Sequence, residues 1–237
     1  MARRIFITGD THRAHDIKKL TNDYFTIGQT LDKEDFVIIC GDFGFIWEKQ
    51  DLTDGRPLKW LDEQPWTTLF VDGNHENHDL LDSLPTEQWC GGAVHRINDS
   101  VLHLMRGEVF EIAGYTFFTF GGADSIDKGA RIEGISWWRR ELPNKEEYQR
   151  AEENLKAHGM KVDYVLTHTA STPILEQFFD CRIRESDYLC DWFKELEEQL
   201  DFKHWYFGHL HADRKMDDRH TLLYQRIIEI DGEEYEF

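Results

Sequence analysis

Residues 36–42 read FVIICGD, an apolar run that is closed by a glycine and an aspartate. Four more runs follow the same plan: RIFITGD at 4–10, TLFVDGN at 68–74, VDYVLTH at 162–168 and HWYFGH at 204–209. Apolar and β-branched runs of this length that are bounded by glycine or threonine are typical of buried strands. We therefore predict five strands, each of which delivers a polar side chain to its carboxyl end.

Helical patterns lie between some of these runs. The segment 144–159, NKEEYQRAEENLKAHG, begins with Asn144 as a predicted N-cap, has Glu147 three residues later and ends at Gly159. A second helix is expected over about 186–200, because its apolar residues share one face and leave the acidic residues to solvent.

The middle of the chain, from about 93 to 122, has a different pattern. AVHRIN, VLHLMRG, EVFEIAG and YTFFTFGG follow one another as short strands with tight turns, which predicts an antiparallel or mixed second sheet. The tail TLLYQRIIEI at 221–230 predicts a last strand. No internal repeat or Pro/Ser-rich linker divides the sequence, so we expect one domain over residues 1–237 with two packed sheets.

Length and composition limit which kinds of protein this sequence can encode. The chain has 237 residues, 40% of them hydrophobic, which is enough for a sizeable core. It has no apolar run long enough for a signal peptide or a membrane span, which predicts a cytoplasmic protein without a membrane partner. The four cysteines have no metal-knuckle spacing and are expected to be reduced.

The formal net charge of −19 argues against a nucleic-acid-binding tract, because such binding depends on Lys and Arg neutralising phosphates. The segment 128–140 is the exception, with four basic residues against Glu133 alone. We interpret it as the segment best suited to face an anion.

The five predicted strand ends carry oxygen and imidazole side chains. Ligands gather at the carboxyl ends of strands in α/β folds. The set has no thiolate, so it suits Mn²⁺, Fe²⁺, Co²⁺ or Zn²⁺ better than a structural zinc knuckle, and it is too large for one ion. Two ions that share a carboxylate are the natural solution. The residues are Asp10, His12, Asp42, Asn74, His75, His168, His209 and His211.

Five short motifs now stand in order: GDTH at 9–12, GDFG at 41–44, GNHE at 73–76, THTA at 167–170 and GHLH at 208–211. Together they resemble the calcineurin-like metallophosphoesterase family. The resemblance implies an α/β sandwich of two mixed β-sheets flanked by α-helices, and it implies hydrolysis of a phosphate ester with two divalent metal ions. Mn²⁺ is the expected metal, with Fe, Co, Ni and Zn as alternatives.

The resemblance also implies a role for each motif residue. Asp10, His12 and His211 match the ligands of a first metal, and Asn74, His168 and His209 match those of a second. Asp42 would bridge the two ions. His75 would stay off the metals and either protonate the leaving oxygen or stabilise the transition state. Glu76 would be a supporting or capping residue. If His209 and His211 serve different ions, the chain must turn between them.

The chemistry behind this arrangement is general. Two dications neutralise the anionic oxygens of the ester and acidify a water, so that a metal-bound hydroxide attacks the P–O bond. An imidazole on the opposite side donates the proton that the leaving group needs. A single Asp after a strand-ending Gly is more often a cap or turn residue than a metal ligand. The prediction of a metal site therefore depends on all five motifs together.

The sequence differs from two subgroups of this superfamily, the protein phosphatases and the nucleases. Protein phosphatases have an Asp and an Arg where GDFGFIWE has Phe45 and Ile46, and related nucleases often have a His at the position of Phe45. Arg13 stands where Gly is frequent. It either reaches the substrate phosphate or pairs with the acidic surface.

The segment GGADSIDKGARIEGISWWRRE at 121–141 is a second candidate for binding the anion. Lys128 and Arg131 are predicted to approach the metals, and Trp137 and Trp138 either line an aromatic wall or belong to the core. We expect a phosphate ester as the substrate, with a preference for a small phosphodiester or a nucleotide. A Ser/Thr protein phosphatase or another phosphomonoesterase is the first alternative, and a catalytically inactive metal-binding scaffold is the second.

Overall fold

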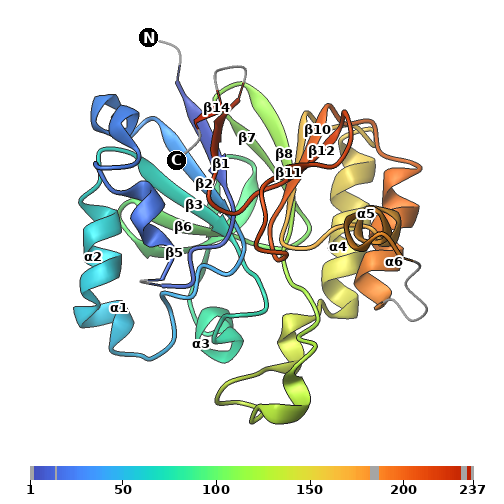
Figure 1. The fold of residues 1–237 in the computed structure, drawn as a ribbon, viewed down its shortest axis with the longest axis horizontal. Helices are drawn as coiled ribbons and strands as arrows, with labels where there is room; N and C mark the ends of the chain where they lie inside the picture. The colour runs from blue at the N-terminus through green and yellow to red at the C-terminus, as the bar shows by residue number, and fades with distance from the viewer. Residues whose placement is uncertain (1–2, 14, 182–186, 231–233, 236–237) are drawn as a thin grey trace.

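The computed structural model describes residues 3–13, 15–181, 187–230 and 234–235. Two β-sheets lie face to face, and helices cover the outer side of each, as Figure 1 shows. The fold is therefore the α/β sandwich of two mixed sheets that the sequence predicts.

The first sheet has eight strands in the described part of the chain, in the order β14-β13-β1-β2-β3-β6-β5-β4. The neighbours β1, β2, β3 and β6 run parallel, and the remaining pairs are antiparallel. The strands are β1 (Ile5–Thr8), β2 (Phe36–Cys40), β3 (Thr67–Val71), β4 (Thr86–Trp89), β5 (Gly92–Asn98), β6 (Val101–Leu104), β13 (Ile227–Glu229) and β14 (Glu234–Tyr235).

The second sheet has six strands among the described residues, in the order β11-β12-β10-β9-β8-β7. The inner pairs are parallel, and β7 and β11 are antiparallel to their neighbours. The strands are β7 (Glu108–Ile112), β8 (Tyr115–Phe120), β9 (Tyr164–Thr167), β10 (His204–Phe207), β11 (Arg214–Lys215) and β12 (His220–Leu222).

Helices α1 (Asp51–Asp54), α2 (Arg56–Asp62) and α3 (His78–Asp82) belong to the side of the first sheet, and α4 (Lys145–Ala157), α5 (Thr172–Phe179) and α6 (Tyr188–Glu197) cover the second. None of the helices within the described residues has the length and hydrophobicity that a bilayer crossing requires. Short 3₁₀ segments are η1 (Ile17–Leu20), η2 (Thr26–Thr30), η3 (Lys128–Ala130) and η4 (Arg139–Glu141).

Alternation along the strands divides the core into three layers. In β1, Ile5 and Ile7 face the second sheet, whereas Phe6 faces the helices on the outer side. The same alternation in β8 sends Phe117 inward and Phe118 toward α4 and α6. Successive strand side chains point to opposite faces, so a strand that is buried on both faces must be apolar throughout.

The local signals of α4 are confirmed. Asn144 accepts a hydrogen bond from the Glu147 backbone N–H at 2.9 Å, and the Glu147 carboxylate accepts from the Asn144 N–H at 2.8 Å. This capping box satisfies two helix-end donors at once. Gly159 follows the end of the helix with φ +66°. The observed α6 lies within the predicted helix over about 186–200, of which residue 186 is outside the described residues.

Two expectations need correction. The predicted meander does not form one sheet, because β5 and β6 complete the first sheet while β7 and β8 begin the second. The tail at 221–230 is not one strand either: β12 pairs with β10, and β13 crosses back to pair with β1. Both differences concern which sheet a strand joins, which long-range packing decides.

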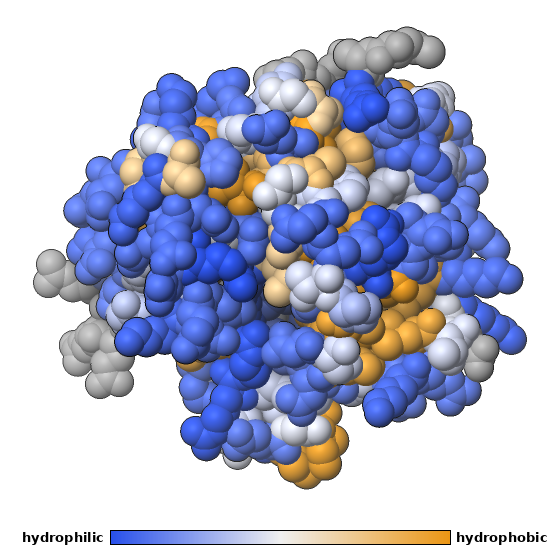
Figure 2. All heavy atoms as spheres, turned by 180° about the vertical axis from the view of Figure 1, so that it is seen from behind, coloured by the Kyte–Doolittle hydropathy of each residue, from blue (hydrophilic) through white to orange (hydrophobic). Residues whose placement is uncertain are grey.

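A lobe at 121–141 extends beyond the sandwich, at the bottom of Figure 1. It leaves large apolar side chains exposed at Ile126, Ile132 and Ile135. Seen from behind, the surface of the molecule is mostly hydrophilic and shows apolar side chains in a few places, one of them at this lower end (Figure 2).

Candidate metal centre

The loops after five strands converge at one edge of the sandwich. Strands β1, β2 and β3 are parallel neighbours in the first sheet, and β9 and β10 are parallel neighbours in the second. The carboxyl ends of parallel strands meet at the same edge, so the loops after them meet too. All five motifs therefore reach one place.

A first group of donor atoms comprises Asp10, His12, Asp42 and His211, whose ligand atoms all lie within 4.8 Å of one another. His12 Nε2 lies 3.2 Å from Asp42 Oδ2, and His211 Nε2 lies 3.2 Å from Asp10 Oδ2. Asp10 and Asp42 are buried, whereas His211 is half exposed. The group thus opens toward solvent on the side of His211.

A second group comprises Asp42, His168 and His209, again within 4.8 Å. His168 Nε2 lies 3.2 Å from Asp42 Oδ1 and 3.1 Å from Asn74 Oδ1, so the Asn74 oxygen belongs to the same cluster. Asp42 is the one residue common to both groups, and its two oxygens face different partners. The structure therefore brings together all seven residues that the sequence predicts as metal ligands.

Four of these residues have a left-handed backbone. The φ angles are 40° at His12, 46° at Asp42, 72° at His209 and 48° at His211. Residues other than glycine rarely adopt this region, and it costs free energy unless the surroundings impose it. The family resemblance implies a turn between His209 and His211 if they serve different ions. The structure has a turn at 209–211, and the two residues belong to different donor groups.

Glycines in two motifs allow the loops to approach one another. A Cβ on Gly73 would collide with Asp42 Oδ1, and a Cβ on Gly208 would collide with Asp10 Oδ1. Each glycine therefore makes room for the carboxylate of another motif.

Residues outside the motifs orient the imidazoles. Asp16 Oδ2 lies 2.8 Å from His12 Nδ1, and the Cys40 carbonyl lies 3.0 Å from His168 Nδ1. When Nδ1 donates to such an oxygen, Nε2 keeps its lone pair for a metal. Tyr224 stacks on His211, with ring centroids 5.0 Å apart. No sequence motif indicates these residues, and only the i, i+4 spacing of Asp16 from His12 is a local signal.

Lys19 holds the backbone of the GDTH loop in place. Its buried ammonium donates to the carbonyls of Gly9 (2.9 Å), Asp10 (2.7 Å) and Tyr224. Burial lowers the pKa of Lys19 to about 8, against the opposing influence of Asp10. The three carbonyls use all three donors of the ammonium group.

The electrostatics of the centre reflect concentrated negative charge. Burial alone would lower the pKa of His12 and of His168, but the hydrogen bonds and charge of Asp42 outweigh it and raise these pKa values to about 9 and about 10. His209 lies further from the carboxylates, and burial lowers its pKa to about 4. A dication would neutralise the same carboxylates, and its binding would release the histidine protons.

The donor set fits a cation by a second observation. Asp10 Oδ2 is buried and accepts no hydrogen bond among the described residues, and the atom 3.2 Å from it, His211 Nε2, is itself a candidate metal ligand. A buried carboxylate oxygen without a partner is costly unless a cation or a donor meets it. Carboxylates, neutral imidazoles and one amide oxygen, without a thiolate, suit divalent metals of the Mn²⁺ to Zn²⁺ series.

His75 lies beside both donor groups and outside them. Its backbone N–H donates to Asp42 Oδ1 at 2.7 Å, and its ring lies 5.5 Å from that of His12, centroid to centroid. The Arg131 guanidinium covers the ring, with nitrogens 3.3 Å from Nδ1 and 3.5 Å from Nε2. Burial lowers the pKa of His75, Asp42 opposes this effect, and Arg131 adds to it.

All three predicted substrate-binding residues are held by acids, and Arg131 itself binds Asp127 at 2.9 Å. Arg13 binds the Asp51 carboxylate at 2.9 and 3.1 Å, which is the surface pairing that the sequence left open. Lys128 binds Asp124 within the lobe. Trp138 is buried and donates from Nε1 to Asp79 at 2.9 Å, so the core alternative holds for that residue.

Glu76 supports the loop after β2. Its buried carboxylate accepts the backbone N–H groups of Phe43 (2.7 Å) and Gly44 (3.0 Å). It therefore holds the GDFG loop against the GNHE loop, a supporting role that agrees with the sequence-based expectation. Burial and the charge of Asp42 raise the pKa of Glu76 to about 8.

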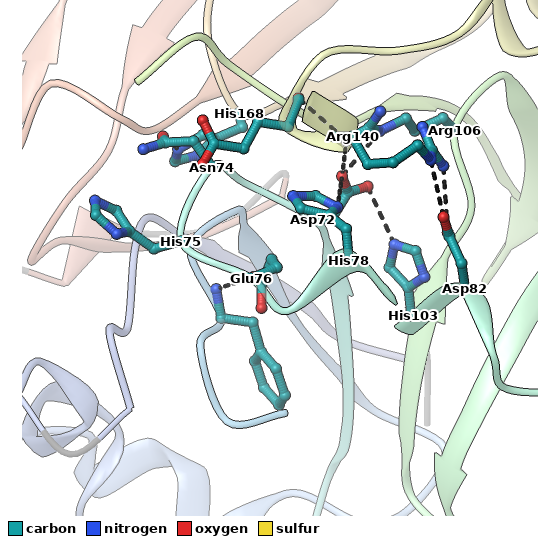
Figure 3. A network of polar contacts seen from close by, with 12 residues as sticks. Asp72, Asn74, His75, Glu76, His78, Asp82, His103, Arg106, Arg140 and His168 are labelled. Atoms are coloured by element: carbon teal, nitrogen blue, oxygen red, sulfur yellow. Dashed lines mark hydrogen bonds and ion pairs between the residues drawn. The ribbon is translucent and has the colours of Figure 1, made fainter. Parts of the chain in front are cut away.

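Behind the GNHE loop lies a buried polar network. Asp72 accepts hydrogen bonds from Arg106 and lies 3.2 Å from His103 Nε2. In Figure 3, Asn74 and His75 lie on one side of this loop, and Asp72, His78, His103 and Arg106 lie on the other. The network contacts the loop from the side that faces away from the donor groups.

Comparison with known proteins identifies the family. A family model described as calcineurin-like phosphoesterase matches residues 3–213. The chain belongs to the calcineurin-like phosphoesterase family. Calcineurin-like phosphoesterases are in general metal dependent and typically carry two ions, and the two donor groups that share Asp42 suit such a pair.

A search of curated protein sequences finds no match. Among solved structures, this calcineurin-like phosphoesterase is similar to phosphopantetheinyl hydrolase (PptH) from Mycobacterium tuberculosis, with 15% identity, a TM-score of 0.41 and coverage of 94% of this chain and 88% of that chain. It is also similar to the Thermus thermophilus sulfate thiohydrolase SoxB in complex with glycerol, with 12% identity, a TM-score of 0.41 and coverage of 96% of this chain and 53% of that chain.

Proposed function

We propose that the protein hydrolyses a P–O bond of a small phosphodiester or a nucleotide with the help of two divalent metal ions. Asp10, His12 and His211 would hold one ion, Asn74, His168 and His209 the other, and Asp42 both. The observation that carries this proposal is the pair of donor groups joined through Asp42. When bound, the ions would supply charge neutralisation at the phosphoryl oxygens and acidify a water.

Residues of the chain would supply the proton transfer and the positioning that the reaction also needs. His75 would donate a proton to the leaving oxygen. Its ring must therefore be protonated before this step. Burial lowers the pKa of His75, which favours release of this proton once the ring carries it. Asp42 fixes the His75 backbone, so the same carboxylate that joins the donor groups also sets the distance of the ring from them.

Arg131 would bind the phosphoryl oxygens. It lies over His75, and a neutral imidazole has one acceptor nitrogen, so at most one of its two close contacts with the ring is a hydrogen bond. Asp127 also binds this guanidinium at 2.9 Å, so a substrate anion would have to share it with that carboxylate. Lys128 and Arg13 are likewise bound, by Asp124 and Asp51, so the contact with His75 is what favours Arg131 over them.

The positions that mark protein phosphatases are filled by core side chains. Phe45 and Ile46 are buried in the layer between the first sheet and its helices. An Asp or Arg function at these positions is therefore missing, which favours a small substrate over a phosphoprotein.

The test compares bis-p-nitrophenyl phosphate with p-nitrophenyl phosphate as substrates of the Mn²⁺-loaded protein, with Asp42→Asn as the control variant. Hydrolysis of the diester at the higher rate, with loss of at least about 100-fold in Asp42→Asn, is expected, since even outer partners of a metal site change activity 10- to 100-fold. A higher rate on the monoester would favour the phosphomonoesterase alternative. No hydrolysis with any of several metals would favour the inactive scaffold.

A further inference from the structure

The Asn74 side chain poses a problem of orientation. Its amide has an oxygen end and a nitrogen end of nearly equal shape, and only the oxygen can bind a metal. In the structure Oδ1 lies 3.1 Å from His168 Nε2, and Nδ2 donates to Ser125 Oγ at 3.0 Å. Both Asn74 and Ser125 are buried. A flip of the amide would exchange the two ends, so some contact must distinguish them.

The contacts of Ser125 supply that distinction. Its backbone N–H donates to Glu141 Oε2 at 3.3 Å, and its side chain lowers the pKa of the Glu141 carboxyl against the effect of burial. Glu141 Oε1 is buried and accepts no hydrogen bond among the described residues, so a donor proton turned toward it is favourable. An ionised carboxylate has no proton to give, so the Ser125 hydroxyl is the group that can turn its proton toward Glu141. The lone pairs of Ser125 Oγ then remain for a donor, and the donor end of Asn74 is its nitrogen. The oxygen of Asn74 is thereby turned toward His168.

Glu141 is itself held in place. Arg106 Nη2 donates to the carbonyls of Arg140 (2.9 Å) and Glu141 (3.3 Å), and Arg106 Nε donates to Asp72 Oδ2 at 2.8 Å. Asp72 precedes the Gly73–Asn74 pair in the chain, and Figure 3 shows its contact with Arg106. One guanidinium therefore joins the Glu141 backbone to the loop that carries Asn74.

We propose that Ser125 and Glu141 are positioning residues that orient the Asn74 amide, so that its oxygen rather than its nitrogen faces the second metal ion. This inference rests on the proposed function, since it requires that the Asn74 cluster binds a metal. Neither residue would touch the ion or the substrate. Their effect would be confined to one of the two metal sites, because Asn74 belongs to one donor group.

The test is a calorimetric titration of the metal-free protein with Mn²⁺. Burial raises the pKa of Glu141 to about 7, so pH 8 keeps the carboxylate ionised. The wild type is expected to show two binding events. Ser125→Ala is expected to weaken one of them about 10- to 100-fold and to leave the other unchanged. Ser125→Thr keeps the hydroxyl and is expected to restore the affinity.

Three further variants test whether the effect of Ser125 depends on the orientation of the Asn74 amide. Glu141→Gln has an amide that can donate as well as accept, so it no longer fixes the hydroxyl, and an intermediate loss is expected. Ser136→Ala removes a hydroxyl of the same lobe that accepts from the Ile132 N–H, and wild-type binding is expected. In an Asn74→Asp background either end of residue 74 presents an oxygen. Ser125→Ala is therefore expected to change the affinity there by about twofold or less.

Wild-type affinity for both ions in Ser125→Ala overturns the inference, and so does an equal loss in the Asn74→Asp background. Should Ser125→Ala fail to fold by circular dichroism, Ser125→Cys takes its place, because a thiol has similar volume and is a weak acceptor. Wild-type affinity in that variant also overturns the inference. A wild-type protein that binds no metal would instead reject the proposed function.

Discussion

His75 stands next to the donor groups, but its ring belongs to neither of them. Its backbone is tied to Asp42, and its ring is covered by Arg131 and lies at an angle to His12. A side chain that is placed so closely and yet kept off the metal cluster suits the transfer of a proton to a leaving group. Its importance should therefore depend on how much the leaving group needs that proton.

For His75→Ala we expect kcat to fall about 10²- to 10⁴-fold for diesters with poor leaving groups, which is the range of general acid catalysis. The loss should be smaller for p-nitrophenolate, since this anion leaves without protonation. The measurement is kcat over a series of substituted aryl diesters, together with the metal content of the protein, which should not change.

The exposed residue His158, whose Nδ1 lies 2.7 Å from the Asn154 carbonyl, offers a matched control. His158→Ala should have wild-type rates across the series. An equal loss in His75→Ala for all leaving groups would argue against proton donation and for a purely electrostatic role.

At the residue scale, the sequence predicts the donors because each follows an apolar run whose end is easy to recognise. Asp10, Asp42 and Asn74 each follow a strand-ending run with a glycine directly before them. Ser125 and Glu141 have no such signal, since they are single polar residues in an irregular segment. The contact of Ser125 with Asn74, and that of Glu141 with Ser125, depend on how the lobe folds back on the first sheet, which no local pattern specifies.

Among the elements, the end of β3 and the turn between β6 and β7 are joined by one buried ion pair. Arg106 and Asp72 are each about 3% or less exposed, and Arg106 also approaches Glu147 of α4 at 3.5 Å. Arg106 holds the pKa of Asp72 well below its usual range, against the effect of burial. Such a pair contributes little net stability, but removal of one partner leaves the other charge buried and alone.

Arg106→Leu is therefore expected to lower the free energy of unfolding by about 3–5 kcal/mol, measured by urea denaturation at pH 7. Adding Asp72→Asn removes the orphaned charge and should restore part of the loss. Arg96→Leu is the control, because the Arg96–Glu87 pair lies at the surface and should matter little. A small loss in Arg106→Leu, similar to that of the control, would contradict the argument.

Elements with local signals were predictable, and the pairing of strands was not. The capping box of Asn144 and Glu147 is legible in the sequence because both partners lie within four residues. The strands at 92–98 and 108–112 read alike, yet they join different sheets. The strand at 92–98 joins the first sheet through β6, which pairs with β3, and the strand at 108–112 joins the second through β8, which pairs with β9. The pairings of β6 with β3 and of β8 with β9 join strands that are distant in the chain, so no local pattern specifies them.

For the molecule as a whole, several buried histidines make stability depend on pH. Burial lowers the pKa of His78 to about 3 and the pKa values of His95 and His204 to about 4. Because unfolded histidine titrates near 6.5, the unfolded chain binds more protons below that pH than the folded one. The stability contributed by these three histidines is therefore fully present above about pH 6.5 and is lost as the pH falls toward their folded-state pKa values.

Between pH 7 and pH 5, His78 alone should account for a loss of about 2 kcal/mol in the free energy of unfolding. His78→Gln cannot titrate, so its stability should fall less over the same range, whatever its stability at pH 7. Urea denaturation of both proteins in the presence of EDTA measures the difference. Identical pH dependence would contradict the argument, because it would show that folding does not shift the pKa of His78.

The left-handed backbone at His12, Asp42, His209 and His211 sets stability against activity. Each such residue costs on the order of 1–3 kcal/mol, and glycine at the same position would relieve most of that strain. A screen that selects only for resistance to heat or protease would thus enrich glycine where the donor atoms are needed. The most stable descendants of this protein would be expected to have lost their chemistry, and any effort to make it more robust should leave these four positions untouched.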